Sequence, residues 1–295
     1  MAEVIDGKRI AAEIRQEVKE AAEELKGKNV TPGLSVVLVG ENPASAVYVR
    51  MKAKACEETG IKSEIIKMSE ETTQEELEAV IDRLNADESV HGILVQLPLP
   101  SQIEERDIIF RIAPEKDVDG FHPVSVGRMM IGDPTAFRPA TPAGVLELLM
   151  RTGNDPAGKR VAIVGRSNIV GKPLAVLLSQ KAEGGNATVT LAHSRTPDLP
   201  AVLREADILV AAIGVAEFVT ADAVKPGAVV IDVGMNRVDD SSTEKGYRLV
   251  GDVAYDEVSE IASAITPVPG GVGPMTIAML LTNCIKAARE ITGVS

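Results

Sequence analysis

The chain opens with a helical pattern of apolar positions. Between residues 7 and 28 these positions recur every three or four residues with charged residues between them; they are Ile10, Ile14, Val18, Ala21 and Leu25. Such spacing is typical of a helix that buries one face. The sequence therefore predicts an amphipathic helix at the start of the first domain.

After this helix, short β-branched runs alternate with helical patterns. The predicted strands are 35–39, 64–68 and 92–95, and the predicted helices that follow them are 44–58, 73–85 and 104–112. Parallel strands need a long crossover between them, and a helix usually supplies it. The first part of the chain is therefore predicted to form a parallel sheet with crossover helices.

A proline-rich segment separates this series from a second one. Residues 113–142 contain five prolines and no sustained period, so we expect an irregular connection with a domain boundary near its end. A second alternating series follows, with a helix at 143–151 and strands at 160–164, 188–192, 208–212 and 229–233.

The last helical pattern, 274–290, follows a bend rich in proline and glycine, and we expect this helix to return to the first domain. The predicted fold class is therefore α/β with two α/β domains, the second a Rossmann-type parallel sheet. We assign residues 1–141 together with 275–295 to a catalytic domain and residues 142–274 to a dinucleotide-binding domain.

Composition and charge exclude several classes of function. The formal charge is −12 and the chain holds only four Phe, three Tyr and no Trp, which argues against nucleic acid as a partner. The longest uncharged apolar stretch, 208–216, is far shorter than the ~20 residues that span a bilayer, so no membrane segment is expected. We interpret the protein as cytoplasmic. Cys56 and Cys284 fall within helical patterns, where a free Cys is usually a small buried apolar residue; a disulfide between them is the alternative.

A glycine-containing turn follows the predicted strand at 160–164. Gly165 stands at the end of the strand and Gly171 opens an apolar helix, an order that places backbone N–H groups where a pyrophosphate binds. Ser167 replaces the second glycine of the usual pattern, and the last glycine comes one residue late. A glycine turn that only packs a helix on a strand is the alternative interpretation.

The end of the next strand favours NADP over NAD as the cofactor. An NAD site typically presents a carboxylate there, whereas this chain offers Ser194, with Arg166 and Arg195 nearby. A hydroxyl and guanidinium groups suit a 2′-phosphate, although Arg195 is equally consistent with a solvated loop charge. Another glycine follows the strand that ends at Asp232, and Met235 lies directly after it.

Two residues with catalytic potential lie on the predicted helix 44–58. The four-residue spacing of Tyr48 and Lys52 puts both on one face. The pair also occurs in short-chain dehydrogenases, but there it follows the glycine loop within one domain, whereas here it precedes that loop. An exposed lysine beside a half-buried tyrosine is the alternative. Gln96 ends a buried strand, where its amide is expected to bond Lys52 or a ligand.

Two further segments carry candidate binding residues. Asp117 and Asp119 flank a valine just before a glycine turn; one carboxylate suits the paired N–H groups of an aminopyrimidine ring, and the other suits a turn cap. The segment 267–275 holds three prolines and three glycines, and ligand contact is one reason to keep such a bend. The three histidines are isolated from one another in the sequence, so we predict no metal.

Five motifs taken together resemble the bifunctional methylenetetrahydrofolate dehydrogenase/cyclohydrolase (FolD) family. In chain order they are Tyr48-Val-x-x-Lys52, Val95-Gln-Leu-Pro-Leu-Pro100, Lys116-Asp-Val-Asp-Gly-Phe121, Gly165-Arg-Ser-x-x-Val-Gly-x-Pro173 and Pro267-Val-Pro-Gly-Gly-Val-Gly-Pro-Met-Thr276. The match covers nearly the whole chain. Ala140 stands where many members carry Cys, and the loop at 183–186 is slightly long; neither touches the proposed chemistry.

The resemblance implies two α/β domains flanking a cleft, a homodimer, and two reactions on folate. NADP would take a hydride from 5,10-methylenetetrahydrofolate, and water would open the methenyl product to 10-formyltetrahydrofolate. Lys52 would serve the hydrolysis, with Gln96 orienting it, Tyr48 stacking on the folate and Asp119 binding the pterin. The implied substrate-binding residues are Val95, Leu97, Pro267, Gly270, Gly271 and Val272, and the implied cofactor-binding residues are Gly165, Arg166, Ser167, Ser194 and Met235.

Two rival functions stay open at the level of sequence. A dehydrogenase that has lost the hydrolytic step would not need both Lys52 and Gln96. A non-catalytic module that senses NADP would bind the cofactor without folate turnover, and would leave Tyr48 and Asp119 without a role.

Overall fold

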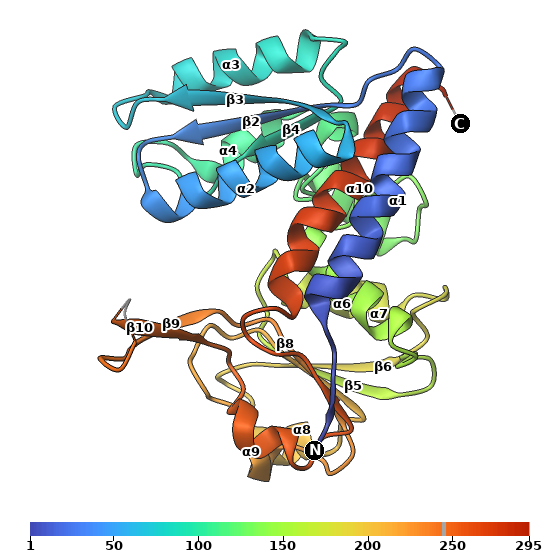
Figure 1. Cartoon of the computed structure of the whole chain (residues 1–295), viewed down its shortest axis with the longest axis vertical. Coiled ribbons are helices and arrows are strands. Elements are labelled where there is room, and N and C mark those ends of the chain that lie inside the picture. Colours follow the sequence, from blue (N-terminus) through green and yellow to red (C-terminus); the bar gives the residue numbers. More distant parts are fainter. Residues whose placement is uncertain (244–245, 295) are drawn as a thin grey trace. The chain divides into compact units, whose positions relative to one another are not determined.

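A computed structural model describes residues 1–243 and 246–294, and the chain divides into two compact units. Unit 1 comprises Met1–Ala11 and Pro139–Thr276, and unit 2 comprises Ala12–Arg138 and the chain from Ile277 onward. Figure 1 shows helices and parallel strands in both units. The α/β class and the Rossmann-type sheet predicted from the sequence are confirmed.

Unit 2 contains a three-stranded parallel sheet in the order β3-β2-β4. Its strands are β2 (Gly33–Val39), β3 (Lys62–Met68) and β4 (Gly92–Val95). Its helices are α2 (Pro43–Thr59), α3 (Gln74–Ala86), α4 (Glu105–Arg111), α5 (Pro123–Met130) and most of α1 (Gly7–Gly27) and α10 (Val272–Thr292). The predicted crossover arrangement is therefore present.

Apolar side chains of β2, β4, α3 and α4 form the core on one face of this sheet. Figure 1 shows α3 on one side of the strands and α2 on the other. A capping box fixes the start of α3: the Thr73 hydroxyl accepts from the N–H of Glu76, and the Glu76 side chain accepts from the N–H of Thr73. These two hydrogen bonds fix the first residue of the helix as Gln74.

The expectation of an irregular connection over residues 113–142 is partly wrong. The segment contains a 3₁₀ turn (Pro114–Lys116), helix α5 and the first residues of α6 (Ala140–Arg151). Pro114 and Pro123 stand at the first positions of their helices. Proline is favoured there because the N–H that it lacks has no partner within the helix. These prolines mark helix starts rather than irregular chain.

Unit 1 is built on a six-stranded parallel sheet in the order β1-β11-β8-β7-β5-β6. The strands are β1 (Glu3–Val4), β5 (Arg160–Val164), β6 (Thr188–Ala192), β7 (Ile208–Ala211), β8 (Val229–Asp232) and β11 (Ala264–Ile265). The helices and turns within the unit are α6, α7 (Gly171–Ser179), α8 (Leu199–Arg204), a 3₁₀ turn (Ala221–Ala223) and α9 (Tyr255–Ser259).

The structure adds elements to unit 1 that the sequence did not predict. An antiparallel pair, β9 (Asn236–Asp239) and β10 (Tyr247–Val250), stands apart from the main sheet. At the amino terminus, β1 pairs in parallel with β11, so residues 1–11 group with unit 1 rather than with the segment that follows them. That residues 1–141 and 275–295 carry catalysis and residues 142–274 bind the dinucleotide stays a prediction.

The carboxyl half of α10 packs within unit 2, as predicted for the last helix. The Asn283 side chain donates to the carbonyls of Val118 and Arg138 at 2.8 and 2.9 Å. Lys286 donates to two further carbonyls of the loop before α6. Arg289 also forms an ion pair with Glu24 of α1 at 3.2 Å, and Figure 1 shows the two helices side by side.

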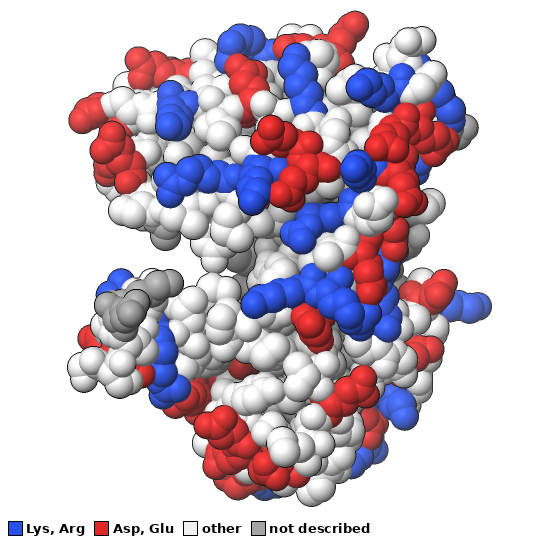
Figure 2. All heavy atoms as spheres, viewed as in Figure 1, with Lys and Arg blue, Asp and Glu red and all other residues white. Residues whose placement is uncertain are grey.

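Acidic and basic side chains are interspersed over the face shown in Figure 2. Within residues 1–243 and 246–294, no helix is long and apolar enough to cross a membrane. Cys56 and Cys284 are both buried and free, as expected.

Candidate active site

Lys52 and Gln96 meet in unit 2, at the carboxyl end of β4. The backbone N–H of Gln96 donates to the Val37 carbonyl at 2.9 Å, which continues the sheet pairing past the last residue of the strand. The Gln96 amide group donates to the Leu97 carbonyl at 2.8 Å, so its oxygen points the other way. That oxygen accepts from Lys52 Nζ at 3.0 Å. The strand thus holds an acceptor in front of an amine from α2.

The surroundings of Lys52 lower its pKa. Burial lowers the pKa of Lys52, and the carboxylate of Asp119 opposes this shift without cancelling it. Burial likewise raises the pKa of Asp119, and Lys52 opposes that shift. A lysine with a lowered pKa can accept a proton nearer neutrality than an exposed lysine can. The pair is therefore suited to proton transfer.

Asp117 and Asp119 have different environments in the glycine turn. Asp117 is buried, and its carboxylate accepts from the N–H groups of Phe121 and His122 at 3.3 and 2.9 Å. Burial raises the pKa of Asp117 to about 7. Asp119 instead interacts with Lys52. The sequence left open which carboxylate caps the turn, and the geometry gives that part to Asp117.

Two side chains to which the sequence analysis assigned no role hold this turn in place. Lys116 Nζ donates to the carbonyls of Leu84, Asn85 and Asp87 at the end of α3, at 2.8 to 3.0 Å. Asn283 reaches the same turn through the Val118 carbonyl. Both contacts join residues far apart in the chain, so no local pattern could have indicated them.

Tyr48 lies one helical turn before Lys52 on α2 and is 41% exposed. Val49, the next residue, is buried. The helix thus buries Val49 while it leaves much of the Tyr48 side chain exposed. Val95 is buried at the end of β4, and Leu97 is half-buried beyond it.

In unit 1, the loop between β5 and α7 can exist only with glycine at two positions. Gly165 has φ +125°, and a Cβ added to it would lie 2.0 Å from the Ala212 carbonyl oxygen. A Cβ on Gly171 would lie 2.0 Å from the carbonyl oxygen of Gly165. The Ser167 hydroxyl, in place of the usual glycine, accepts from the N–H of Val170 at 3.1 Å. This tight, exposed loop at a helix start fits a pyrophosphate.

The next loop, after β6, carries the groups predicted to select a 2′-phosphate. β5 and β6 are neighbours in the sheet with Val164 opposite Ala192, so both loops leave the same edge. Arg166, Ser194 and Arg195 are all exposed there. The His193 ring accepts from the N–H of Arg195 at 3.1 Å, which fixes the local backbone. The residues present therefore fit NADP.

The bend at 267–272 packs against the start of α1 within unit 1. The N–H of Gly271 donates to the Pro267 carbonyl at 2.8 Å, and Gly270 has φ +114°. Its carbonyl accepts from the N–H of Lys8 at 3.1 Å. A Cβ on Gly7 would lie 1.8 Å from the Gly271 carbonyl oxygen, so this approach requires glycine.

The predicted site residues therefore fall into two groups. Unit 2 holds Tyr48, Lys52, Val95, Gln96, Leu97 and Asp119, and the structure brings Lys52, Gln96 and Asp119 together. Unit 1 holds Gly165, Arg166, Ser167, Ser194, Met235, Pro267, Gly270, Gly271 and Val272. Met235 is 45% exposed beyond the end of β8.

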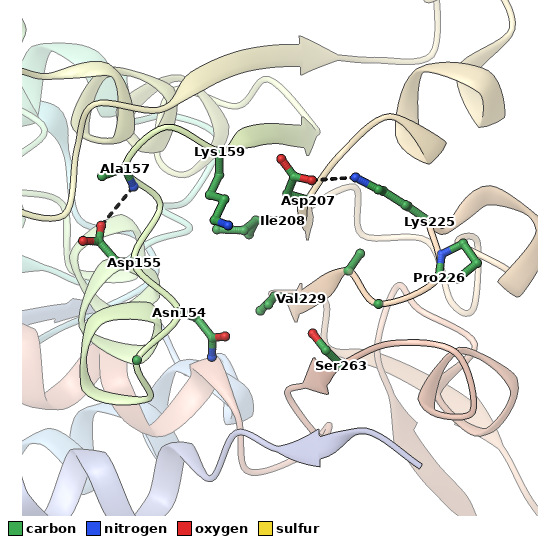
Figure 3. Close-up of a pocket in the computed structure, with 13 residues that line it drawn as sticks. Asn154, Asp155, Ala157, Lys159, Asp207, Ile208, Lys225, Pro226, Val229 and Ser263 are labelled. Atoms are coloured by element: carbon green, nitrogen blue, oxygen red, sulfur yellow. Dashed lines mark hydrogen bonds and ion pairs between the residues drawn. The ribbon is translucent and has the colours of Figure 1, made fainter.

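A cavity of about 520 Å³ lies at the opposite edge of the six-stranded sheet (Figure 3). Its lining includes Lys159, Asp207 and Lys225, and Lys225 is paired with Asp207 at 2.6 Å. These residues stand at the amino ends of the strands or beside them. Open parallel sheets bind ligands at their carboxyl ends, so we do not assign the cofactor to this cavity.

Two family models match most of the chain. Residues 5–119 match the family model described as tetrahydrofolate dehydrogenase/cyclohydrolase, catalytic domain, and residues 139–292 match the corresponding NAD(P)-binding domain. The chain is 57% identical over 286 residues to the bifunctional protein FolD of Prosthecochloris aestuarii, covering 96% of this chain and 97% of that protein.

Two solved structures are also similar over nearly their whole lengths. The bifunctional enzyme FolD of Campylobacter jejuni, a methylenetetrahydrofolate dehydrogenase/cyclohydrolase, has a TM-score of 0.92 and 49% identity, covering 98% of this chain and 99% of that one. The FolD of Trypanosoma brucei, in complex with NADP cofactor and inhibitor, has a TM-score of 0.91 and 42% identity, with 98% of each chain covered.

Proposed function

The chain belongs to the tetrahydrofolate dehydrogenase/cyclohydrolase family, and we propose that the two groups of residues described above divide its two reactions between them. As a member, it is an NADP-linked dehydrogenase and a cyclohydrolase of one-carbon folate metabolism. The first reaction oxidises 5,10-methylenetetrahydrofolate to the 5,10-methenyl compound. The second hydrolyses that compound to 10-formyltetrahydrofolate.

Hydrolysis needs proton transfers around the attacking water, and the amine of Lys52 is suited to make them. Its amine faces the Gln96 oxygen at 3.0 Å, and burial lowers its pKa. A bound methenyl cation would lower the pKa of Lys52 further, because like charges disfavour the ammonium. We therefore assign proton transfer to Lys52 and the orientation of its amine to Gln96.

The same group supplies folate recognition. Asp119 interacts with Lys52 while Asp117 caps the turn, which supports Asp119 as the carboxylate for the pterin's paired N–H groups. Tyr48 presents a ring one turn from the amine, in a position to stack on the folate. The remaining proposed substrate contacts are Val95 and Leu97 in this group, and Pro267, Gly270, Gly271 and Val272 in unit 1.

Hydride transfer requires alignment rather than a base, because the folate nitrogen lone pair drives loss of the hydride. NADP supplies the hydride acceptor when bound. Gly165 and Gly171 shape the loop for its pyrophosphate, and Ser167 fixes that loop. Arg166 and Ser194 are assigned to the 2′-phosphate, and Met235 to the wall of the same site.

The partners follow from the same proposal. We expect tetrahydrofolate derivatives as the substrates, no nucleic acid, and a homodimer in the cytoplasm. The formal charge of −12 supports the exclusion of nucleic acid. Sedimentation of the purified protein tests the homodimer.

The observation that carries the proposal is the hydrogen bond from Lys52 to Gln96 beside Asp119. A paired absorbance assay tests it: methylenetetrahydrofolate is supplied with NADP or with NAD, and formation and decay of the methenyl compound are followed in the same cuvette. We expect faster reduction of NADP than of NAD, followed by enzyme-dependent decay. NADP binding without folate turnover would instead favour the sensing module.

A further inference from the structure

Two carboxylates are buried together behind the carboxyl ends of β7 and β8. Asp232, the last residue of β8, is 3% exposed, and Asp252 is fully buried. The N–H of Asp252 donates to Asp232 Oδ1 at 2.9 Å, so the two side chains belong to one network. Buried like charges are costly unless hydrogen bonds compensate them. The backbone groups that these two carboxylates bind should therefore explain why both are buried.

Each carboxylate holds a loop that leaves the sheet. Asp252 Oδ2 accepts from the N–H groups of Ile213 and Gly214 at 2.6 and 2.9 Å, just beyond β7. Asp232 Oδ1 accepts from the N–H of Gly234 at 2.9 Å, just beyond β8. The remaining oxygen of Asp252 accepts from the Asn236 side chain at 2.9 Å. Carboxylate oxygens thus hold the backbone of both loops on their buried side.

Two glycines allow this close packing. A Cβ on Gly234 would lie 2.2 Å from Asp252 Oδ1, and a Cβ on Gly251 would lie 1.8 Å from Asp232 Oδ2. Neither position tolerates a side chain, because the carboxylates occupy the space. The outer sides of the same loops are open, since Gly214 and Met235 are exposed.

The strand order indicates which part of a dinucleotide faces these loops. The glycine loop follows β5, and the residues proposed to bind the 2′-phosphate follow β6. In the sheet these strands stand in the order β8-β7-β5-β6, so β7 and β8 lie on the other side of β5 from β6. A dinucleotide whose pyrophosphate lies over β5 and whose adenosine lies over β6 must extend its nicotinamide half over β7 and β8. The glycine loop after β5 also lies against the loop after β7, because a Cβ on Gly165 would meet the carbonyl oxygen of Ala212, next to Ile213.

We propose that Asp252, together with Asp232, is a positioning residue that fixes the 213–214 and 234–235 loops as the wall for the nicotinamide half of the cofactor. This inference rests on the proposed NADP-linked function. Asp252 does not touch the cofactor itself; it acts through the backbone that does. Its removal leaves two backbone N–H groups without their acceptor and frees the loop after β7.

The test compares three variants in both half-reactions. Asp252→Ala removes the acceptors, and Asp252→Asn keeps an oxygen that can face Ile213 and Gly214. Asp207→Asn is the matched control: its carboxylate also accepts a backbone N–H, that of Arg160 at 2.9 Å, but at the opposite edge of the sheet. Hydrolysis of methenyltetrahydrofolate is measured without cofactor, and NADP reduction is measured for KM and kcat, at a temperature where circular dichroism shows every variant folded.

We expect Asp252→Ala to raise the KM for NADP about tenfold or more and to lower the kcat of NADP reduction, while hydrolysis changes less than about twofold. Asp252→Asn should restore most of the loss, and Asp207→Asn should match the wild type. An unchanged KM and kcat in Asp252→Ala, or an equal fall in both half-reactions, would overturn the proposal. Failure of the proposed function is distinguishable, because the wild type itself would then lack both activities.

Discussion

Replacing Gln96 by glutamate changes the charge beside Lys52 with almost no change of shape. The amide oxygen of Gln96 lies 3.0 Å from Lys52 Nζ, so the substitution puts a carboxylate at that distance. The attraction is about 5 kcal/mol at an effective dielectric constant of ~20. Both side chains are only half-buried, and screening by water reduces the attraction to ~3 kcal/mol, so the substitution raises the pKa of Lys52 above that of the wild type.

This rise holds Lys52 as the ammonium and removes the amine that takes a proton. At a fixed pH below the pKa, the fraction of free amine falls about a hundredfold, and the cyclohydrolase kcat should fall with it. The assay follows decay of the methenyl compound across a range of pH, with NADP reduction measured in parallel. Gln16→Glu, on the exposed side of α1, adds the same charge as a control.

Two outcomes would refute this reasoning. If the cyclohydrolase pH profile of Gln96→Glu overlies the wild-type profile, a negative charge at position 96 does not change the protonation of the group that transfers the proton. A loss of equal size in Gln16→Glu would mean that net charge, rather than the contact with Lys52, controls the rate.

Three further predictions concern the carboxylate beside Lys52, the glycine loop and the residues assigned to the 2′-phosphate. Because Asp119 raises the pKa of Lys52 while burial lowers it, Asp119→Asn should move the rising limb of the cyclohydrolase kcat–pH profile to lower pH, even as folate KM increases. Gly171→Ala adds a Cβ that would lie 2.0 Å from a carbonyl oxygen, so NADP affinity measured by calorimetry should fall at least about tenfold while methenyl hydrolysis persists. Ser194→Ala should raise the KM for NADP roughly tenfold and leave the KM for NAD unchanged, because only NADP carries the 2′-phosphate.

Periodic segments could be predicted from the sequence, and short or irregular ones could not. The stripe of apolar residues in α10 and the alternation of β2 to α4 indicated elements close to the observed bounds, because burial imposes a regular spacing. β1 and β11 have only two residues each, too few for any period. Pro114 and Pro123 misled the prediction, because proline is common both in irregular chain and at helix starts.

The contact between Lys52 and Gln96 could be anticipated from the sequence, but not the side chains that support it. Lys52 and Gln96 stood at a helix face and at a strand end, where chemistry is expected, and the structure brings them together. The anchors of the turn, Lys116 and Asn283, act across long separations in sequence. The carboxylate network of Asp252 likewise depends on the packing of two loops, which no local pattern encodes.

The division of the two reactions between the two groups of residues is tested most directly by Lys52→Met, with both reactions followed in one cuvette from methylenetetrahydrofolate and NADP. We expect NADP reduction to survive in part and the methenyl compound to accumulate, decaying no faster than it does without enzyme. Decay at the wild-type rate would contradict the role of Lys52, and equal loss of both activities would contradict the division itself.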